Sequence, residues 1–177
     1  PEQSLWRAEN LAFEIQLFHR GFLYKPRVEI AIVEHGMVRP LAFDPGQFHY
    51  GNNAFPEPVP TNLDFAGFRI HYPLNRPDYY DELLTFQGSS YFRALGRNHS
   101  YGLSARALAL NTEGPEAEEF PVFRSFWIER PKDQNSITVY GLLDSQSITG
   151  AYTFVIVPGA KTAMHVDAHL FPRRDLS

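Results

Sequence analysis

The chain of 177 residues carries a net charge of −4 at pH 7, no cysteine and 44% hydrophobic residues, which predicts one folded domain rather than a disordered segment. The lack of cysteine excludes disulfides, thiolate nucleophiles and Cys-ligated zinc. No basic run is present to neutralise phosphates, and no apolar stretch approaches the ~20 residues of a membrane helix, so neither nucleic-acid binding nor a membrane span is expected.

Apolar and polar residues alternate along most of the chain, as they do in half-buried strands. In chain order, strands are predicted at residues 11–18, 27–33, 65–72, 123–129, 137–143, 152–157 and 162–171. The stretch 88–110 predicts a further hairpin with its turn at 96–100. A short helix is predicted at 78–84, where acidic residues come early. Many strands joined by short turns predict an all-β fold of antiparallel sheet, either a sandwich or a barrel.

Two segments carry more specific expectations. Residues 152–157 read YTFVIV, which is apolar at nearly every position and predicts a strand covered on both faces. Residues 113–119 read EGPEAEE, which predicts an acidic loop exposed to solvent.

The stretch HVDAH brings together residue types that bind metals. On a strand, His165, Asp167 and His169 would project from one face. The alternative is a polar face turned to solvent, with the intervening apolar residues facing the core. Those residues are Met164, Val166, Ala168 and Leu170. Facial sites of two histidines and a carboxylate usually draw ligands from more than one element, so no metal site is predicted.

Carboxylates offer no marked catalytic pair. A glycosidase needs one protonated and one ionised carboxyl group across a cleft. No local pattern singles out two of them, so the catalytic residues stay unassigned, and no cofactor is expected. The carboxylates considered are Asp64, Asp78, Asp81, Glu82, Glu129 and Asp144.

The loop YGNNAF holds Tyr50, Asn52 and Asn53. Each asparagine amide offers a donor and an acceptor to a sugar hydroxyl. Asparagine and glycine are also ordinary turn residues, so a turn and a binding loop are both open.

The 88–110 hairpin places Tyr91 and Arg93 on one face. Arg106 stands among small and apolar residues, where a charge needs a partner: a tyrosine, a carboxylate or a ligand. Ser104 lies in GLSAR, which resembles a nucleophile elbow, but Arg106 replaces the second glycine and an elbow needs a parallel α/β fold. Ser104 is therefore interpreted as structural.

Six stretches follow one another between Tyr50 and Gly159: YGNNAF, LDFAGFRIHYPLNRPDYYDE, GSSYFRALG, YGLSARALAL, EEFPVFRSFWIERP and LLDSQSITGAYTFVIVPG. This collinear set resembles the periplasmic glucan biosynthesis protein G/D family of Gram-negative bacteria. The resemblance implies export to the periplasm and a role in making osmoregulated periplasmic glucans, whose backbone is β-1,2-linked glucose with β-1,6 branches in some.

The family fold implies an N-terminal β-sandwich of the galactose mutarotase-like type, followed by an immunoglobulin-like domain. Residues 1–177 are then expected to form a single segment of that sandwich. The immunoglobulin-like domain, and the two acidic residues with which some members of the D branch hydrolyse β-1,2-glucan by inversion, are expected beyond Ser177.

The expected function is to bind β-glucan and to trim or branch it. The alternatives are a non-catalytic glucan-binding scaffold, a β-1,2-glucan hydrolase whose acids lie elsewhere and, from the fold alone, mutarotase-like chemistry. The expected partners are glucan and the remainder of the polypeptide. The residues expected to contact sugar are Tyr50, Asn52, Asn53, Tyr91, Arg93 and Arg106.

Overall fold

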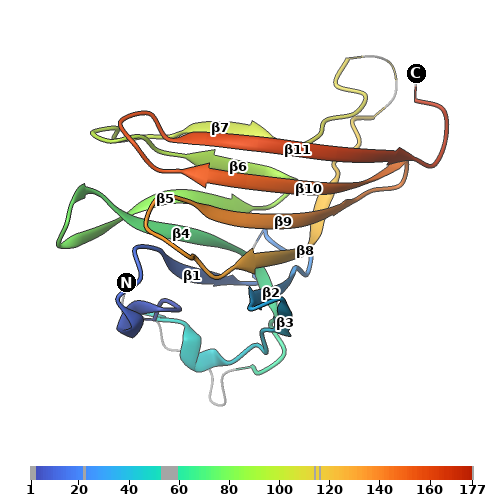
Figure 1. Cartoon of the computed structure of the whole chain (residues 1–177). Helices are drawn as coiled ribbons and strands as arrows, with labels where there is room; N and C mark the ends of the chain where they lie inside the picture. Colours follow the sequence, from blue (N-terminus) through green and yellow to red (C-terminus); the bar gives the residue numbers. More distant parts are fainter. Residues whose placement is uncertain (1–2, 22, 53–59, 114, 116, 177) are drawn as a thin grey trace.

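The computed structural model describes residues 3–21, 23–52, 60–113, 115 and 117–176, and nearly all of its regular structure is β-strand (Figure 1). Two short 3-10 turns, η1 (Arg7–Glu9) and η2 (Pro45–Gln47), are the only helical elements in these ranges. The strands are β1 (Glu14–His19), β2 (Glu29–Glu34), β3 (Met37–Pro40), β4 (Phe65–Arg76), β5 (Tyr79–Gln87), β6 (Tyr91–Ala94), β7 (Leu103–Arg106), β8 (Val122–Glu129), β9 (Ile137–Asp144), β10 (Ile148–Val157) and β11 (Ala163–Pro172).

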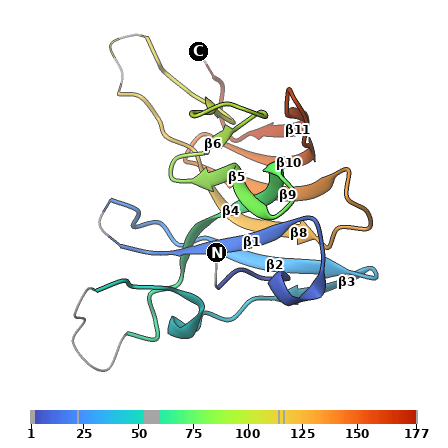
Figure 2. The same cartoon turned by 90° about the vertical axis from the view of Figure 1, so that its left-hand side faces the viewer.

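The strands form two sheets that pack face to face, as the two views in Figures 1 and 2 show. The five-stranded sheet has the order β1-β4-β5-β6-β7, and the six-stranded sheet has the order β11-β10-β9-β8-β2-β3. The predicted β-sandwich is confirmed. One pairing differs from the expected antiparallel pattern, because β2 runs parallel to β8. A long excursion through the other sheet separates these two strands in the sequence, and such a crossover permits a parallel pair.

Aromatic side chains fill the space between the sheets. The ring of Phe86 on β5 lies 5.0–5.3 Å, between centroids, from the rings of Phe68, Phe126 and Phe154. All four side chains are at most 2% exposed. The high phenylalanine content of the sequence therefore serves mainly the core, where edge-on and tilted ring pairs pack densely.

The helix predicted at 78–84 is wrong. Asp78 lies in the turn between β4 and β5, and the strand continues to Gln87. Leu84 and Phe86 on β5 pair with Ile70 and Phe68 on β4 and are fully buried. Burial of these alternate side chains in the core outweighs the weak helical preference of a short acidic stretch.

The strand predicted to be covered on both faces is covered on one. Along β10 the side chains of Tyr152, Phe154 and Ile156 are buried, whereas Val155 and Val157 on the outer face are partly exposed. Apolar residues on both faces of a strand therefore did not require a third layer here.

The sandwich is open where β7 and β11 form its end. Val166 and Leu170 pair with Phe154 and Gly150 and so lie on the inner side of β11, yet they are 47% and 42% exposed. Leu103 on β7 is 90% exposed. The prediction that Val166 and Leu170 face a core is wrong, because the neighbouring sheet does not extend over them.

Candidate functional site

The outer face of the five-stranded sheet carries a row of polar side chains. Gln16, Arg69, Thr85, Arg93 and Ser104 are directly paired neighbours across all five strands. Alternation explains the row, because residues two apart on a strand share a face and the neighbours of Gln16, Arg69 and Thr85 are buried in the core. We call this surface the polar face.

Glu82 joins two arginines of the polar face. Its carboxylate accepts a hydrogen bond from Arg93 Nη2 and lies 3.4 Å from Arg69 Nη1. Burial raises the pKa of Glu82, but the hydrogen bond from Arg93 and the charge of Arg69 outweigh it, so the pKa lies below its usual value. Glu82 is therefore held ionised, as an anchor for the two guanidinium groups.

Each arginine of the polar face also lies over an aromatic ring. The guanidinium carbons lie 4.7 Å from the ring centre of Phe18 for Arg69, and 5.2 Å from that of Tyr101 for Arg93. The Tyr101 side chain is 71% exposed. A ring that is held from one side by a cation and open on the other is a flat surface for a ligand. The sequence analysis missed Tyr101, although an aromatic residue in a Gly-rich hairpin loop was a usable signal.

Arg106 has a carboxylate partner. Its Nη1 lies 2.5 Å from Glu118 Oε1, and its guanidinium lies 5.4 Å from the ring centre of Phe120, which is 52% exposed. Tyr91 pairs with Arg106 across the hairpin, and its hydroxyl lies 2.8 Å from Ser104 Oγ. Ser104 and Tyr91 therefore share a hydrogen bond on one face of the hairpin.

The acidic loop is only in part a solvated excursion. Glu118 pairs with Arg106, and Glu119 accepts hydrogen bonds from the backbone N–H and the hydroxyl of Ser147 at 2.8 and 2.6 Å. Hydrogen bonds from Ser145 and Ser147 lower the pKa of Glu119 to about 2. The end of this loop is therefore fixed to both sheets by its carboxylates.

The predicted sugar-contacting residues fall into two separate groups. Tyr91, Arg93 and Arg106 lie together on β6 and β7. Tyr50 packs beside His19 at the end of β1, with ring centres 5.6 Å apart, and β4 and β5 separate β1 from β6 (Figure 2). Asn52 is exposed in a turn next to Tyr50, and Asn53 lies outside the described residues.

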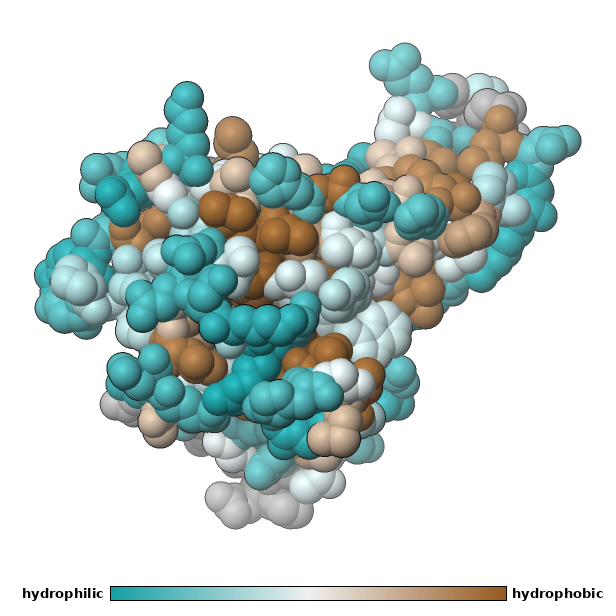
Figure 3. All heavy atoms as spheres, in the orientation of Figure 1, coloured by the Kyte–Doolittle hydropathy of each residue, from teal (hydrophilic) through white to brown (hydrophobic). Residues whose placement is uncertain are grey.

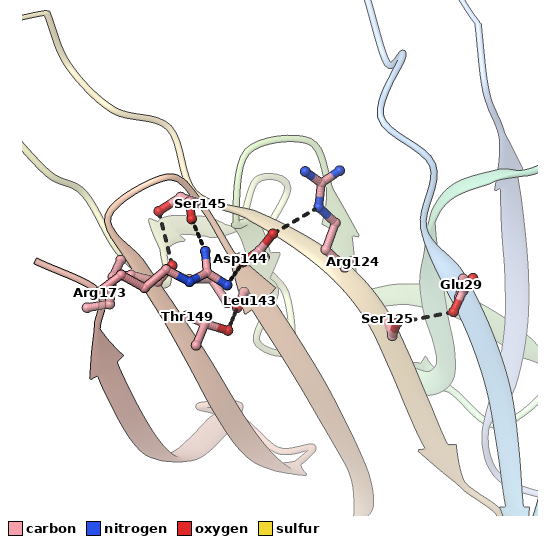
Figure 4. A network of polar contacts seen from close by, with 9 residues as sticks. Glu29, Arg124, Ser125, Leu143, Asp144, Ser145, Thr149 and Arg173 are labelled. Atoms are coloured by element: carbon pink, nitrogen blue, oxygen red, sulfur yellow. Dashed lines mark hydrogen bonds and ion pairs between the residues drawn. The ribbon is translucent and has the colours of Figure 1, made fainter.

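The carboxylates considered as catalytic residues are occupied by partners. Arg124 and Arg173 flank Asp144, with Asp144–Arg173 at 2.7 Å (Figure 4). The remaining carboxylates are held by a cation or a backbone N–H: Asp64 by Arg20 and Arg27, Asp78 by Arg76, Asp81 by the Asn75 N–H, and Glu129 by Lys132. Hydrogen bonds from arginines lower the pKa of Asp78 and of Glu82, whereas a general acid needs a raised pKa.

The HVDAH residues project from one face of β11, as the sequence predicted. His165, Asp167 and His169 pair with residues of the outer face of β10, and His169 Nε2 lies 3.0 Å from Asp167 Oδ1. In the described part of the chain, no three His, Cys, Asp or Glu side chains are placed so that they could hold a metal ion together. The described residues also contain no helix that is long and apolar enough to cross a membrane.

Comparison with known proteins gives one family. The family model described as periplasmic glucan biosynthesis protein, MdoG, matches residues 1–177. The chain belongs to the MdoG family. MdoG relatives include glucans biosynthesis protein G of Shewanella frigidimarina, which is 53% identical over 99% of this chain and 32% of its own length. Glucans biosynthesis protein G of Vibrio cholerae is 51% identical over 100% of this chain and 33% of its own length.

The chain therefore spans about a third of the length of these MdoG relatives. The family membership predicted from the six collinear stretches is confirmed.

Proposed function

We propose that this protein acts in the periplasm during glucan biosynthesis and binds β-1,2-linked glucan on the polar face. The observation that carries the proposal is the pair of exposed rings, Tyr101 and Phe120, that lie on Arg93 and Arg106. The names of the MdoG relatives support a role in glucan biosynthesis.

The physical argument rests on the two chemistries of a sugar ring. Its C–H surface packs on a flat aromatic side chain, and its hydroxyls need donors and acceptors. Tyr101 and Phe120 supply the flat surfaces. Arg93, Tyr91 and Ser104 supply hydrogen-bonding groups within the same hairpin. Glu82 fixes Arg93 beforehand, which reduces the side-chain entropy lost on binding.

We favour binding without catalysis for this part of the molecule. Hydrolysis by inversion needs a carboxylic acid that keeps its proton near neutral pH. Asp78, through its hydrogen bond from Arg76, and Glu82 both have pKa values below the usual ones. Trimming or branching of glucan would require carboxylates other than those considered above.

We also propose that the chain forms one segment of a longer sandwich domain and packs against further parts of the polypeptide. The greater length of the MdoG relatives supports this. So does the exposure of Leu103 on the edge strand β7, and of Val166 and Leu170 on one face of the edge strand β11, since apolar patches left exposed often mark an interface.

Calorimetric titration of the full-length protein with linear β-1,2-glucan tests the binding proposal. We expect Tyr101→Ala, and separately the Tyr91→Ala/Arg93→Gln double variant, to weaken binding at least tenfold, the equivalent of about 1.4 kcal/mol. Tyr79→Ala is the matched control, because Tyr79 is 59% exposed on β5 but lies at the far end of the β4–β5 hairpin. Wild-type affinity in folded Tyr101 and Tyr91/Arg93 variants would refute the assignment.

A further inference from the structure

A cavity of about 390 Å³ opens on the other side of the molecule, where β2, β3 and the middle of β8 meet on the six-stranded sheet. Figure 3 views the molecule from the side of this sheet and shows hydrophobic side chains set between hydrophilic ones. The volume lies in the range of small-ligand sites. None of the predicted sugar-contacting residues lines it.

The register of the strands explains why a hollow forms here. Pro40, Ala31 and Trp127 are paired neighbours on β3, β2 and β8. Phe126 and Ile128 point into the core and are buried, so Trp127 between them points outward. The methyl group of Ala31 lies between the larger side chains of Pro40 and Trp127, and its small size leaves a depression beside the indole ring.

Charged and hydroxyl groups line the rim of this cavity. Arg27 Nη2 lies 3.8 Å from Glu29 Oε1, and Arg27 Nε lies 3.7 Å from Asp64 Oδ2. Ser125 Oγ is 3.5 Å from Glu29 Oε2, as drawn in Figure 4. These contacts are long, and a carboxylate accepts up to about four hydrogen bonds. The side chains of Arg27 and Glu29 are 59% and 67% exposed, so their polar atoms are accessible to a ligand.

Asp64 is held in an unusual backbone conformation, with φ = 58°. The backbone N–H of Arg20 donates to the carbonyl oxygen of Asp64 at 3.0 Å, and the guanidinium of Arg20 lies 3.7 Å from its carboxylate. Left-handed backbone at a residue other than glycine persists where surrounding contacts fix it, and such positions cluster at binding sites.

The lining selects the class of ligand. The carboxylates of Glu29 and Asp64 balance the charges of Arg27 and Arg20, so the site has no excess positive charge for an anion, and the charged rim disfavours a wholly apolar molecule. A ring with many hydroxyls satisfies both features, because its hydroxyls donate to Glu29 and Asp64 while its C–H surface packs on Trp127.

We propose that this cavity is a second carbohydrate site that takes one neutral sugar ring, either a free hexose or the end unit of a glucan. Its ligand class is argued from the cavity alone. It lies on the opposite outer face from the polar face, so a short saccharide occupies the two sites independently.

Tryptophan fluorescence reports on this site directly. Trp127 lines the cavity, whereas Trp6 is only 6% exposed. Trp127→Phe separates the signal of this site from that of every other tryptophan in the full-length protein, because a sugar response that comes from the site disappears in this variant. We expect glucose, the β-1,2-linked glucose disaccharide, or both, to change the emission of the full-length protein saturably. A response to glucose and the disaccharide alike indicates a site for any hexose, and a response to the disaccharide alone indicates a site for a glucan end. A response to inorganic phosphate but to neither sugar would overturn the ligand class.

The decisive variant fills the cavity without removing a ligand contact. Ala31→Leu should weaken sugar binding at least tenfold, and Ala151→Leu, an exposed position on the outer face of the same sheet, should leave it unchanged. Glu29→Gln changes an exposed side chain only and should weaken binding about tenfold, so it remains informative if Ala31→Leu does not fold. Unchanged sugar affinity in folded Ala31→Leu and Glu29→Gln proteins would overturn the proposal.

The two binding proposals can be refuted independently of each other. Tyr101→Ala should leave the fluorescence response intact while it weakens long-chain glucan binding. If Ala31→Leu changes nothing and Tyr101→Ala weakens glucan binding, the cavity proposal is wrong and the function of the polar face stands. If only Ala31→Leu has an effect, the cavity proposal stands and that of the polar face is wrong.

Discussion

Replacement of Glu82 by glutamine removes the one carboxylate that both arginines of the polar face share, while it keeps the shape of the side chain. The side chain of Glu82 is 19% exposed, and those of Arg93 and Arg69 are 26% and 32% exposed. Exposed ion pairs contribute about 0–1 kcal/mol, and loss of one partner of a buried pair costs about 3–5 kcal/mol. This intermediate burial predicts a loss of about 2 kcal/mol in the free energy of unfolding.

The pH dependence separates a charge effect from a packing effect. The folded-state pKa of Glu82 lies below the ordinary value of about 4.5 for a glutamate, so its contribution to stability is fully present above about pH 4.5 and is lost as the pH falls through the folded pKa. Below that pH the wild-type residue is neutral, like glutamine. The stability difference between wild type and Glu82→Gln should therefore shrink toward zero in acid.

Urea denaturation at a series of pH values measures both quantities. With a slope of about 1–3 kcal/mol per molar urea, the loss at pH 7 lowers the midpoint by roughly 1 M. Glu29→Gln, whose side chain is 67% exposed, is the control and should change the free energy of unfolding by less than about 0.5 kcal/mol. A Glu82→Gln deficit that stays constant from pH 7 into acid would refute the electrostatic reasoning.

Four further predictions concern stability. Gly67→Ala should destabilise the protein by about 2 kcal/mol or more in urea denaturation, because φ is +145° and a Cβ would collide with the Phe86 carbonyl oxygen; no change would contradict the stated backbone geometry. Phe86→Ala should cost about 3–5 kcal/mol and leave a cavity, which a midpoint shift of only a few tenths of a molar would disprove. Glu119→Gln should destabilise at pH 7 but lose its effect between about pH 4.5 and 2, since the folded pKa is lowered to about 2; a pH-independent deficit would argue against this. Leu103→Lys should lower the melting temperature of the full-length protein by several degrees, because Leu103 is 90% exposed here and is proposed to pack against the rest of the polypeptide, and an unchanged melting temperature would contradict that interface.

The local pattern of the sequence was sufficient for an all-β fold and for several of the strand faces. Alternation placed Tyr91 with Arg93, and His165 with His169, on common faces, because side chains on a strand repeat every two residues whatever the strand packs against. The same rule failed at residues 78–84, where a short acidic stretch fits a helix and a strand equally well. Pairing with β4 decided in favour of the strand.

The prediction that Arg106 needs a partner is confirmed. The need of Arg106 for a partner followed from elementary electrostatics, and the partner was one of the three kinds considered. The choice of Glu118 could not follow, because a loop position is fixed only by the contacts that the folded chain makes. The contacts of Tyr101 and Phe120 could not follow from the sequence either. The guanidinium over each ring belongs to a different segment of the chain, and only the fold brings the two together.

The sequence by itself determined the family, the β-architecture and the residues that share a strand face. These depend on collinear motifs and on local periodicity. Only the tertiary structure decided that Tyr50 is separated from Tyr91 by two strands, that Glu82 holds two arginines, and that Ala31 leaves a hollow beside Trp127. Each of these depends on which strands become neighbours and in which register, and long-range pairing of that kind is set by burial of the whole core.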